Sequence, residues 1–159
     1  MNRFALHGTF VDTPTPDALR VRTGYLLCED GVCAGFSPDA PAGVPVRDYA
    51  GQLITPGLVD LHLHAPQYSY CGTAMDLELL DWLQRYTYPE EARYADPGYA
   101  KLGYGYFVRD LKASATTRAC IFATLHTDAT LELMHQLKDA GLGAFVGKLA
   151  MDRNSPDSY

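Results

Sequence analysis

The sequence predicts a mixed α/β chain with two parts. Residues 1–52 have the pattern of short strands separated by turns, and no helical pattern of useful length occurs among them. From residue 53 onward, strand and helix patterns alternate in the order βαβαβ, which is typical of a parallel sheet covered by helices. We therefore expect one domain over residues 1–52 and a second over residues 53–159.

Four apolar runs predict the strands of the first part. They cover residues 4–11, 19–28, 32–36 and 44–49. Asp30 and Gly31 separate the second run from the third, and these residue types favour a tight hairpin turn.

The second part begins with a strand over residues 58–64, in which apolar and polar residues alternate. This period of two assigns Leu61 and Leu63 to the face on which helices would pack. Asp76 is the expected N-cap of a helix over residues 77–86. That helix belongs to an insertion at about residues 71–95, a position where lids and binding loops tend to occur.

The remaining elements have clearer boundary signals. Asp96 and Pro97 are typical of a helix start, and an apolar stripe from Ala100 to Leu111 follows. The further elements predicted are a buried strand over residues 116–125, a helix from Asp128 to Ala140 ended by Gly141, and a strand over residues 143–150.

Composition excludes several classes of protein. The chain has 13 Lys and Arg against 19 Asp and Glu, a formal charge of −6, so it lacks the basic surface that nucleic acid or an anionic membrane requires. No apolar run approaches the roughly 20 residues of a spanning helix, and the N-terminus lacks the apolar core of a secretory signal. The four cysteines are unevenly spaced and do not form a disulfide framework. We expect a soluble, reduced, cytoplasmic protein.

His62 and His64 are the strongest local signal of chemistry. Residues two apart on a strand share a face, with Cα atoms about 6.6 Å apart. Two such imidazoles can converge on one metal ion, with Zn–N distances of about 2.0–2.1 Å. The alternative interpretation is a pair of partly exposed histidines at a sheet edge. Their place at the end of an apolar strand favours a site, because parallel barrels carry their chemistry there.

These residues also carry a family resemblance. Residues 55–64, TPGLVDLHLH, resemble the signature of the amidohydrolase superfamily, whose first barrel strand ends in a metal-binding His-x-His. Blocks similar to the guanine deaminases of that superfamily occur at residues 64–70, 80–89, 122–128 and 145–154. The resemblance implies an N-terminal portion of a small β-sandwich, followed by about the first three βα units of a TIM-type (β/α)8 barrel that is incomplete in this chain.

The resemblance also implies a site. His62 and His64 would be ligands of one zinc ion, and His64 and Gln67 would contact guanine. Zinc supplies hydroxide at neutral pH, and attack by this hydroxide would convert guanine to xanthine and ammonia. The Gln67 amide has a donor and an acceptor, which suits the mixed edge of guanine. An exposed loop amide is the alternative for Gln67.

Other candidates have two interpretations each. His126 either takes part in catalysis or orients a neighbouring loop. Lys148 is better explained as a solvated or ion-paired lysine than as a metal bridge. Trp82, Tyr86 and Tyr88 either line a purine pocket or form the apolar underside of a docked helix, and we favour the helix.

The cysteines give no clear metal site. Cys28 and Cys33 flank the predicted turn, but zinc binding by thiolates would need a second pair with matching spacing. Facing positions across a hairpin account for them. Cys71 and Cys120 receive no role.

The predicted site is incomplete within the sequence. A catalytic zinc normally has three protein ligands, and a barrel has eight strands. We therefore expect the catalytic residues beyond Tyr159, a full-length enzyme for which a homodimer is one candidate assembly, and no guanine turnover by the 159 residues alone. The alternatives are an amidohydrolase acting on another base or cyclic amide, and a non-catalytic truncated remnant.

Overall fold

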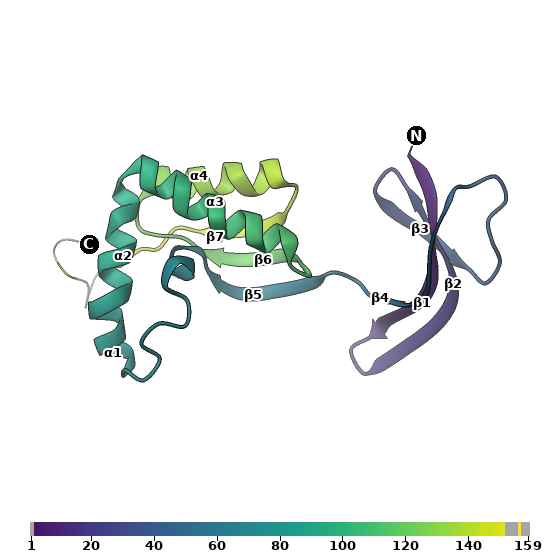
Figure 1. Ribbon diagram of the computed structural model, residues 1–159, viewed down its shortest axis with the longest axis horizontal. Helices are drawn as coiled ribbons and strands as arrows, with labels where there is room; N and C mark the ends of the chain where they lie inside the picture. Colours follow the sequence, from purple (N-terminus) through teal and green to yellow (C-terminus); the bar gives the residue numbers. More distant parts are fainter. Residues whose placement is uncertain (1, 152–155, 157–159) are drawn as a thin grey trace. The chain divides into compact units, whose positions relative to one another are not determined.

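The computed structural model describes residues 2–151 and 156, and it confirms a mixed α/β chain. The chain divides into two compact units, Met1–Pro56 and Gly57–Tyr159. Figure 1 shows β1 to β4 in the first unit, and β5 to β7 with the helices in the second. Among the described residues, no helix has the length and apolar character needed to cross a membrane.

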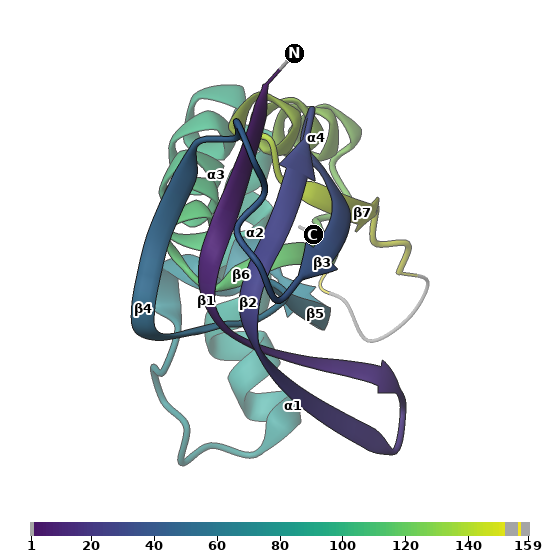
Figure 2. The ribbon, with the colours of Figure 1, turned by 90° about the vertical axis from the view of Figure 1, so that its right-hand side faces the viewer.

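The first unit is a four-stranded sheet with the order β3-β2-β1-β4, as Figure 2 shows. Its strands are β1 (Arg3–Thr15), β2 (Ala18–Glu29), β3 (Val32–Ser37) and β4 (Val46–Ile54). β2 pairs antiparallel with both β1 and β3, whereas β4 pairs parallel with β1. β4 is longer than predicted, because its pairing with β1 resumes after an irregularity and continues through Leu53 and Ile54.

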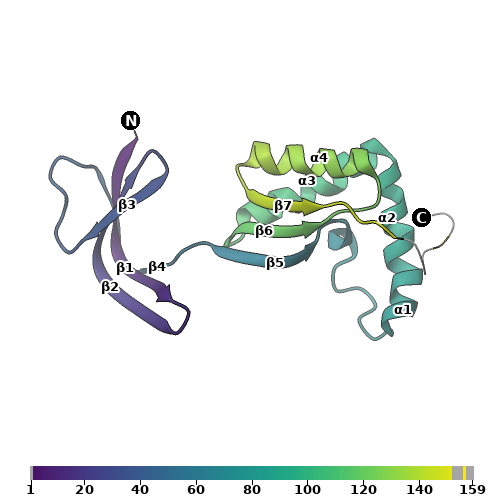
Figure 3. The ribbon, with the colours of Figure 1, turned by 180° about the vertical axis from the view of Figure 1, so that it is seen from behind.

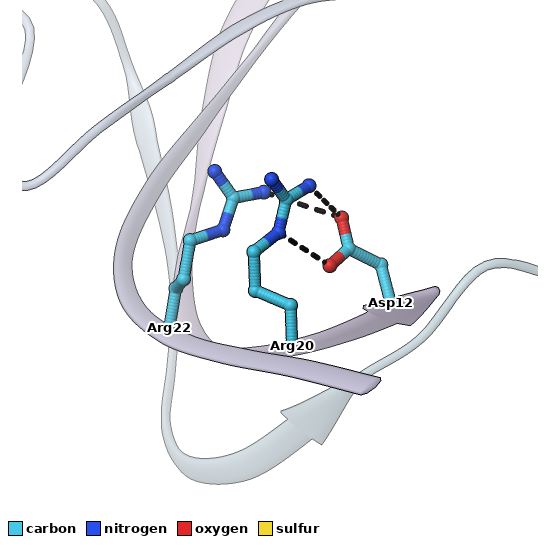
Figure 4. Close-up of polar contacts among 3 residues, drawn as sticks. All are labelled: Asp12, Arg20 and Arg22. Atoms are coloured by element: carbon cyan, nitrogen blue, oxygen red, sulfur yellow. Dashed lines mark hydrogen bonds and ion pairs between the residues drawn. The ribbon is translucent and has the colours of Figure 1, made fainter. Parts of the chain in front are cut away.

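An ion cluster stabilises the long β1–β2 hairpin (Figure 4). Arg20 donates two hydrogen bonds to the Asp12 carboxylate, at 2.9 and 2.6 Å, and Arg22 donates a third at 3.3 Å. The hydrogen bond from Arg20 is the main reason why the pKa of Asp12 is lowered. The Arg22 guanidinium also lies 4.0 Å from the Phe36 ring centre, so this cluster connects the hairpin to β3.

The second unit contains a parallel sheet with the order β5-β6-β7. Its strands are β5 (Leu58–His64), β6 (Thr116–Phe122) and β7 (Gly143–Gly147). The helices α3 (Pro97–Ala113) and α4 (Thr127–Ala140) lie on the same face of this sheet, as Figures 1 and 3 show.

The core of this unit lies between the two helices and the sheet. Its larger buried side chains are Tyr94, Tyr104, Phe107, Val108, Ile121, Leu133 and Leu137. Leu63 packs against this core, as predicted, but Leu61 is 77% exposed, which contradicts the prediction. β5 is an edge strand whose pairing with β6 is irregular between Asp60 and Leu63, and the main strand contacts of α3 and α4 are with β6 and β7.

The structure confirms two of the helix boundaries that the sequence predicts. The Asp96 carboxylate accepts a hydrogen bond from the Tyr99 amide at 2.8 Å, and Pro97 is the first residue of α3. Gly141 ends α4 with a left-handed φ of 76°, which a side chain would disfavour. α4 begins at Thr127, one residue before the predicted start.

The helix predicted over residues 77–86 is wrong in its bounds. The Leu77 amide bonds to the Ala74 carbonyl in a turn, so the helix begins later, with Glu78 rather than Asp76 as its N-cap. The elements that follow are α1 (Leu79–Trp82), a π-helical segment (Leu83–Thr87), α2 (Tyr88–Ala92) and a 3-10 turn (Arg93–Ala95). A π-type hydrogen bond from the Tyr88 amide to the Leu83 carbonyl links α1 to α2.

β6 and β7 are shorter than predicted, because they end at Phe122 and Gly147 rather than at residues 125 and 150. The Thr124 hydroxyl accepts a hydrogen bond from the His126 amide at 3.3 Å. This local bond turns the backbone out of the sheet and into α4.

Candidate metal and substrate site

β5 brings His62 and His64 together at its C-terminal end. Their Nε2 atoms are 3.1 Å apart, and their ring centres are 5.0 Å apart. The Asp60 carboxylate accepts a hydrogen bond from the His62 amide at 3.0 Å and so supports the strand end. The Nε2 atoms of the two rings therefore face the same point in space.

The Phe122 ring packs against both histidines of this pair. Phe122 is the β6 residue in register with His64. The two rings stack, with their centres 4.9 Å apart and an angle of 21° between their planes. The His62 ring centre lies 5.0 Å from the same phenyl ring. Sequence reasoning missed this role, although Phe122 begins one of the blocks that carry the family resemblance.

The histidine pair fits a tetrahedral metal ion. Zn–N distances of about 2.0–2.1 Å and a tetrahedral angle place two ligand nitrogens about 3.3 Å apart, close to the 3.1 Å between the Nε2 atoms. Burial lowers the pKa of His64, and the neighbouring His62 lowers it further. Both effects favour the neutral imidazole, which is the form that binds metal. Within residues 2–151 and 156, no group of three His, Cys, Asp or Glu side chains completes a metal site.

Gln67 lies one short turn beyond the histidine pair. It belongs to the 3-10 helix Ala65–Tyr70, which begins directly after His64 and buries its first two residues. The Gln67 side-chain amide donates a hydrogen bond to the Glu91 carboxylate at 3.4 Å. Glu91 is only 3% exposed, so this contact connects Gln67 to the interior of the insertion.

The rest of this 3-10 helix is held by the insertion and by α3. The Tyr94 hydroxyl donates to the Pro66 carbonyl at 3.4 Å, and the Tyr70 hydroxyl donates to Thr87 Oγ1 at 2.9 Å. The Tyr68 hydroxyl donates to Asp110 on α3. These contacts fix the segment that carries Gln67 relative to the end of β5.

Glu90 is the strongest of these anchors. It accepts hydrogen bonds from Ser69 at 2.7 Å, from Arg93 at 2.9 Å and from the Tyr99 hydroxyl. Burial raises the pKa of Glu90, but these hydrogen bonds outweigh it and hold the pKa below its ordinary value of 4.5. Sequence reasoning also missed Glu90 and Glu91, whose adjacent acidic side chains gave no periodic signal.

Replacing Glu90 by glutamine is expected to destabilise the protein by about 1–2 kcal/mol at pH 7, through loss of charged hydrogen bonds. Because the folded-state pKa is depressed, the stabilisation is present above pH 4.5 and is lost as the pH falls through the folded-state pKa. Guanidinium unfolding at pH 7 and below pH 4.5 measures both effects. The exposed Glu78→Gln is the control, and an equal loss at both pH values would contradict the assignment.

The other candidate residues occupy different positions. His126 is the N-cap residue of α4, and its pKa is lowered by burial and by Lys148. Lys148 is exposed and donates to the Leu149 carbonyl. Trp82 lies against Tyr70 with ring centres 5.5 Å apart, and its indole donates to the Thr73 carbonyl.

The aromatic residues of the insertion pack within it. Tyr88 is 6% exposed. Trp82 lines an apolar pocket of about 290 Å³ together with Ala74, Met75, Leu77 and Leu79. The burial of Tyr88 favours the docked-helix interpretation for that residue.

Residues 53–159 match the amidohydrolase family. The chain belongs to that family. The match covers the whole of the described α/β unit, including the histidine pair and the segment that carries Gln67. Membership in the amidohydrolase family implies a metal-dependent protein.

Within the amidohydrolase family, the chain is similar to guanine deaminases. It is 37% identical to the guanine deaminase of Escherichia coli over 168 aligned positions, which cover 96% of this chain. It is 47% identical to that of Homo sapiens over 103 positions, or 65% of this chain. A crystal structure of guanine deaminase from C. acetobutylicum with bound guanine superimposes with a TM-score of 0.93 at 43% identity, over 99% of this chain.

The chain spans only part of these relatives. It covers 38% of the E. coli enzyme, 23% of the human enzyme and 38% of the C. acetobutylicum chain. Of the sequence block at residues 145–154, residues 152–154 lie outside the described residues.

Proposed function

We propose that the full-length protein hydrolytically deaminates guanine to xanthine and ammonia. The observation that carries this proposal is the convergence of the His62 and His64 Nε2 atoms at 3.1 Å, with Gln67 held one turn further on. Its support from comparison is the likeness to guanine deaminases, one of which has guanine bound in its active site.

In this proposal, His62 and His64 hold one zinc ion through their Nε2 atoms. Bound zinc would supply hydroxide at neutral pH for attack on the guanine carbon that carries the exocyclic amine. Burial lowers the pKa of His64 and so favours the neutral form that binds metal, and Phe122 restricts both imidazole rings by packing against them. The remaining ligands and the proton-transferring groups would come from beyond residue 159.

Gln67 is the proposed contact to the purine, together with His64. Its amide nitrogen has two hydrogens, and one of them bonds to Glu91. This bond orients the amide, so that its oxygen and its second N–H remain available for a ring with adjacent donors and acceptors. Glu91 therefore acts as a positioning residue for Gln67.

We also propose that β5 to β7, α3 and α4 form the first part of a (β/α)8 barrel, and that β1 to β4 form part of a small β-sandwich. Phe145 on β7 is 83% exposed. A large apolar side chain in that position is expected to become buried when further strands close the barrel.

An assay of the full-length protein tests the function. With zinc supplied, we expect loss of guanine with equal formation of xanthine and ammonia. Turnover of another base or a cyclic amide in preference to guanine would contradict the substrate and favour a different amidohydrolase. Absence of any turnover by a zinc-loaded protein would favour a non-catalytic member.

Replacing Gln67 by alanine in the full-length protein is expected to lower kcat/KM for guanine by about tenfold to a hundredfold, because a buried polar partner is worth about 1–3 kcal/mol. Zinc content should not change, since Gln67 is not a ligand. Steady-state kinetics and metal analysis measure the two effects. Gln84→Ala, at an exposed position, is the matched control. Equal kinetics for the two variants would contradict the role of Gln67.

A further inference from the structure

The β2–β3 hairpin places two thiols directly opposite each other. The strand register pairs Cys28 with Cys33, next to the pair formed by Glu29 and Val32. A turn of two residues joins the strands, with left-handed φ values of 47° at residue 30 and 84° at Gly31. Such a turn matches the twist of the strands and fixes their register. All four cysteines of the chain are free thiols in the structure.

The position of this pair within the hairpin suits a disulfide. In a hairpin with a two-residue turn, the pair beside the turn exchanges hydrogen bonds and the next pair does not. Cys28 and Cys33 are that next pair. Opposed residues in such a pair have Cα atoms about 4.5 Å apart, and disulfides occur at Cα separations of about 4.4–6.8 Å.

The two thiols differ in exposure, and this difference suggests an order of reaction. Cys33 is exposed, whereas Cys28 is only 9% exposed and packs in the sheet. Burial raises the pKa of the Cys28 thiol, the adjacent Cys33 raises it further, and Arg47 on β4 opposes both effects. The exposed thiol is therefore the one that a reagent in solution reaches first.

We propose that Cys28 and Cys33 are a redox-sensitive dithiol that closes to a cross-strand disulfide on exchange with a low-molecular-weight disulfide such as oxidised glutathione. The Cys33 thiolate attacks the external disulfide, forms a mixed disulfide and releases one external thiol. Cys28, as thiolate, then attacks the Cys33 sulfur and releases the second external thiol. The two protein thiols are oxidised, the external disulfide is reduced, and the two thiol protons pass to the released thiolates. This inference does not depend on the proposed function.

Peptide mass spectrometry of the oxidised chain tests whether Cys28 and Cys33 form this disulfide. Trypsin releases both cysteines in one peptide, because no Lys or Arg lies between Arg22 and Arg47. After incubation with oxidised glutathione, thiol alkylation and digestion without reductant, we expect this peptide to be lighter by two hydrogen atoms and alkylated at neither cysteine. Dithiothreitol should restore alkylation at both positions.

Single substitutions separate the two steps. Cys28→Ser should stop the reaction at a Cys33–glutathione mixed disulfide, and Cys33→Ser should leave Cys28 reduced and open to alkylation after unfolding. The double variant Cys71→Ser/Cys120→Ser is the matched control and should form the disulfide as the unmodified chain does. A glutathione adduct that persists at Cys33 in the unmodified chain, or no modification at all, would overturn the proposal. Because Cys33 is exposed, its substitution keeps the test decisive even if Cys28→Ser does not fold.

Discussion

Replacing His62 or His64 by alanine in the full-length protein is expected to abolish zinc retention and guanine turnover together. Each substitution removes one of the two nitrogens that converge at 3.1 Å. Substitution of residues that only support metal ligands typically lowers metal affinity by about 10–100-fold, so loss of a ligand itself should exceed about 100-fold. Metal analysis after dialysis and an assay of xanthine formation measure the two losses.

A third histidine provides the control for this experiment. His135 is exposed on α4, so His135→Ala should retain both zinc and activity. Circular dichroism should show the same secondary structure in all three variants. If either His62→Ala or His64→Ala keeps its full zinc content, that residue is not a ligand. Loss of activity with zinc retained would instead assign the histidine to substrate binding.

The parts of the fold that could be predicted from the sequence are those determined by local patterns. The alternation of apolar and polar residues over 58–64 predicts β5 and its two histidines on one face, and the structure brings their Nε2 atoms together. Asp96 and Gly141 are local capping signals: Asp96 begins α3 and Gly141 ends α4, as expected. In each case, the residues that determine the structure are close in sequence.

The parts that could not be predicted depend on contacts between distant segments. Phe122 lies beneath the histidine pair because β6 pairs in parallel with β5, a register that neither strand specifies alone. Glu91 contacts Gln67 across 24 positions of sequence. The π-helical segment before Tyr88 likewise reflects the packing of the insertion and not a periodic pattern.

Replacing Leu133 by alanine is expected to destabilise the protein by about 2–5 kcal/mol, the largest stability effect that we predict for a single side chain. Leu133 is 0% exposed and belongs to the core between α4 and the sheet. Truncation removes its apolar contacts and leaves a cavity, since closely packed surroundings relax only in part. Guanidinium unfolding followed by circular dichroism measures the change in the free energy of unfolding.

Leu131 on the same helix provides a matched control, because it is 47% exposed and Leu131→Ala removes the same atoms. Its effect should lie within about 0.5 kcal/mol of zero. The core that contains Leu133 also contains Ile121, the β6 residue next to Phe122, so that loss of packing there should loosen the support beneath the histidine pair. We therefore expect Leu133→Ala in the full-length protein to lose zinc at a lower guanidinium concentration than Leu131→Ala. Equal stability and equal zinc retention in the two variants would show that this core does not support the site.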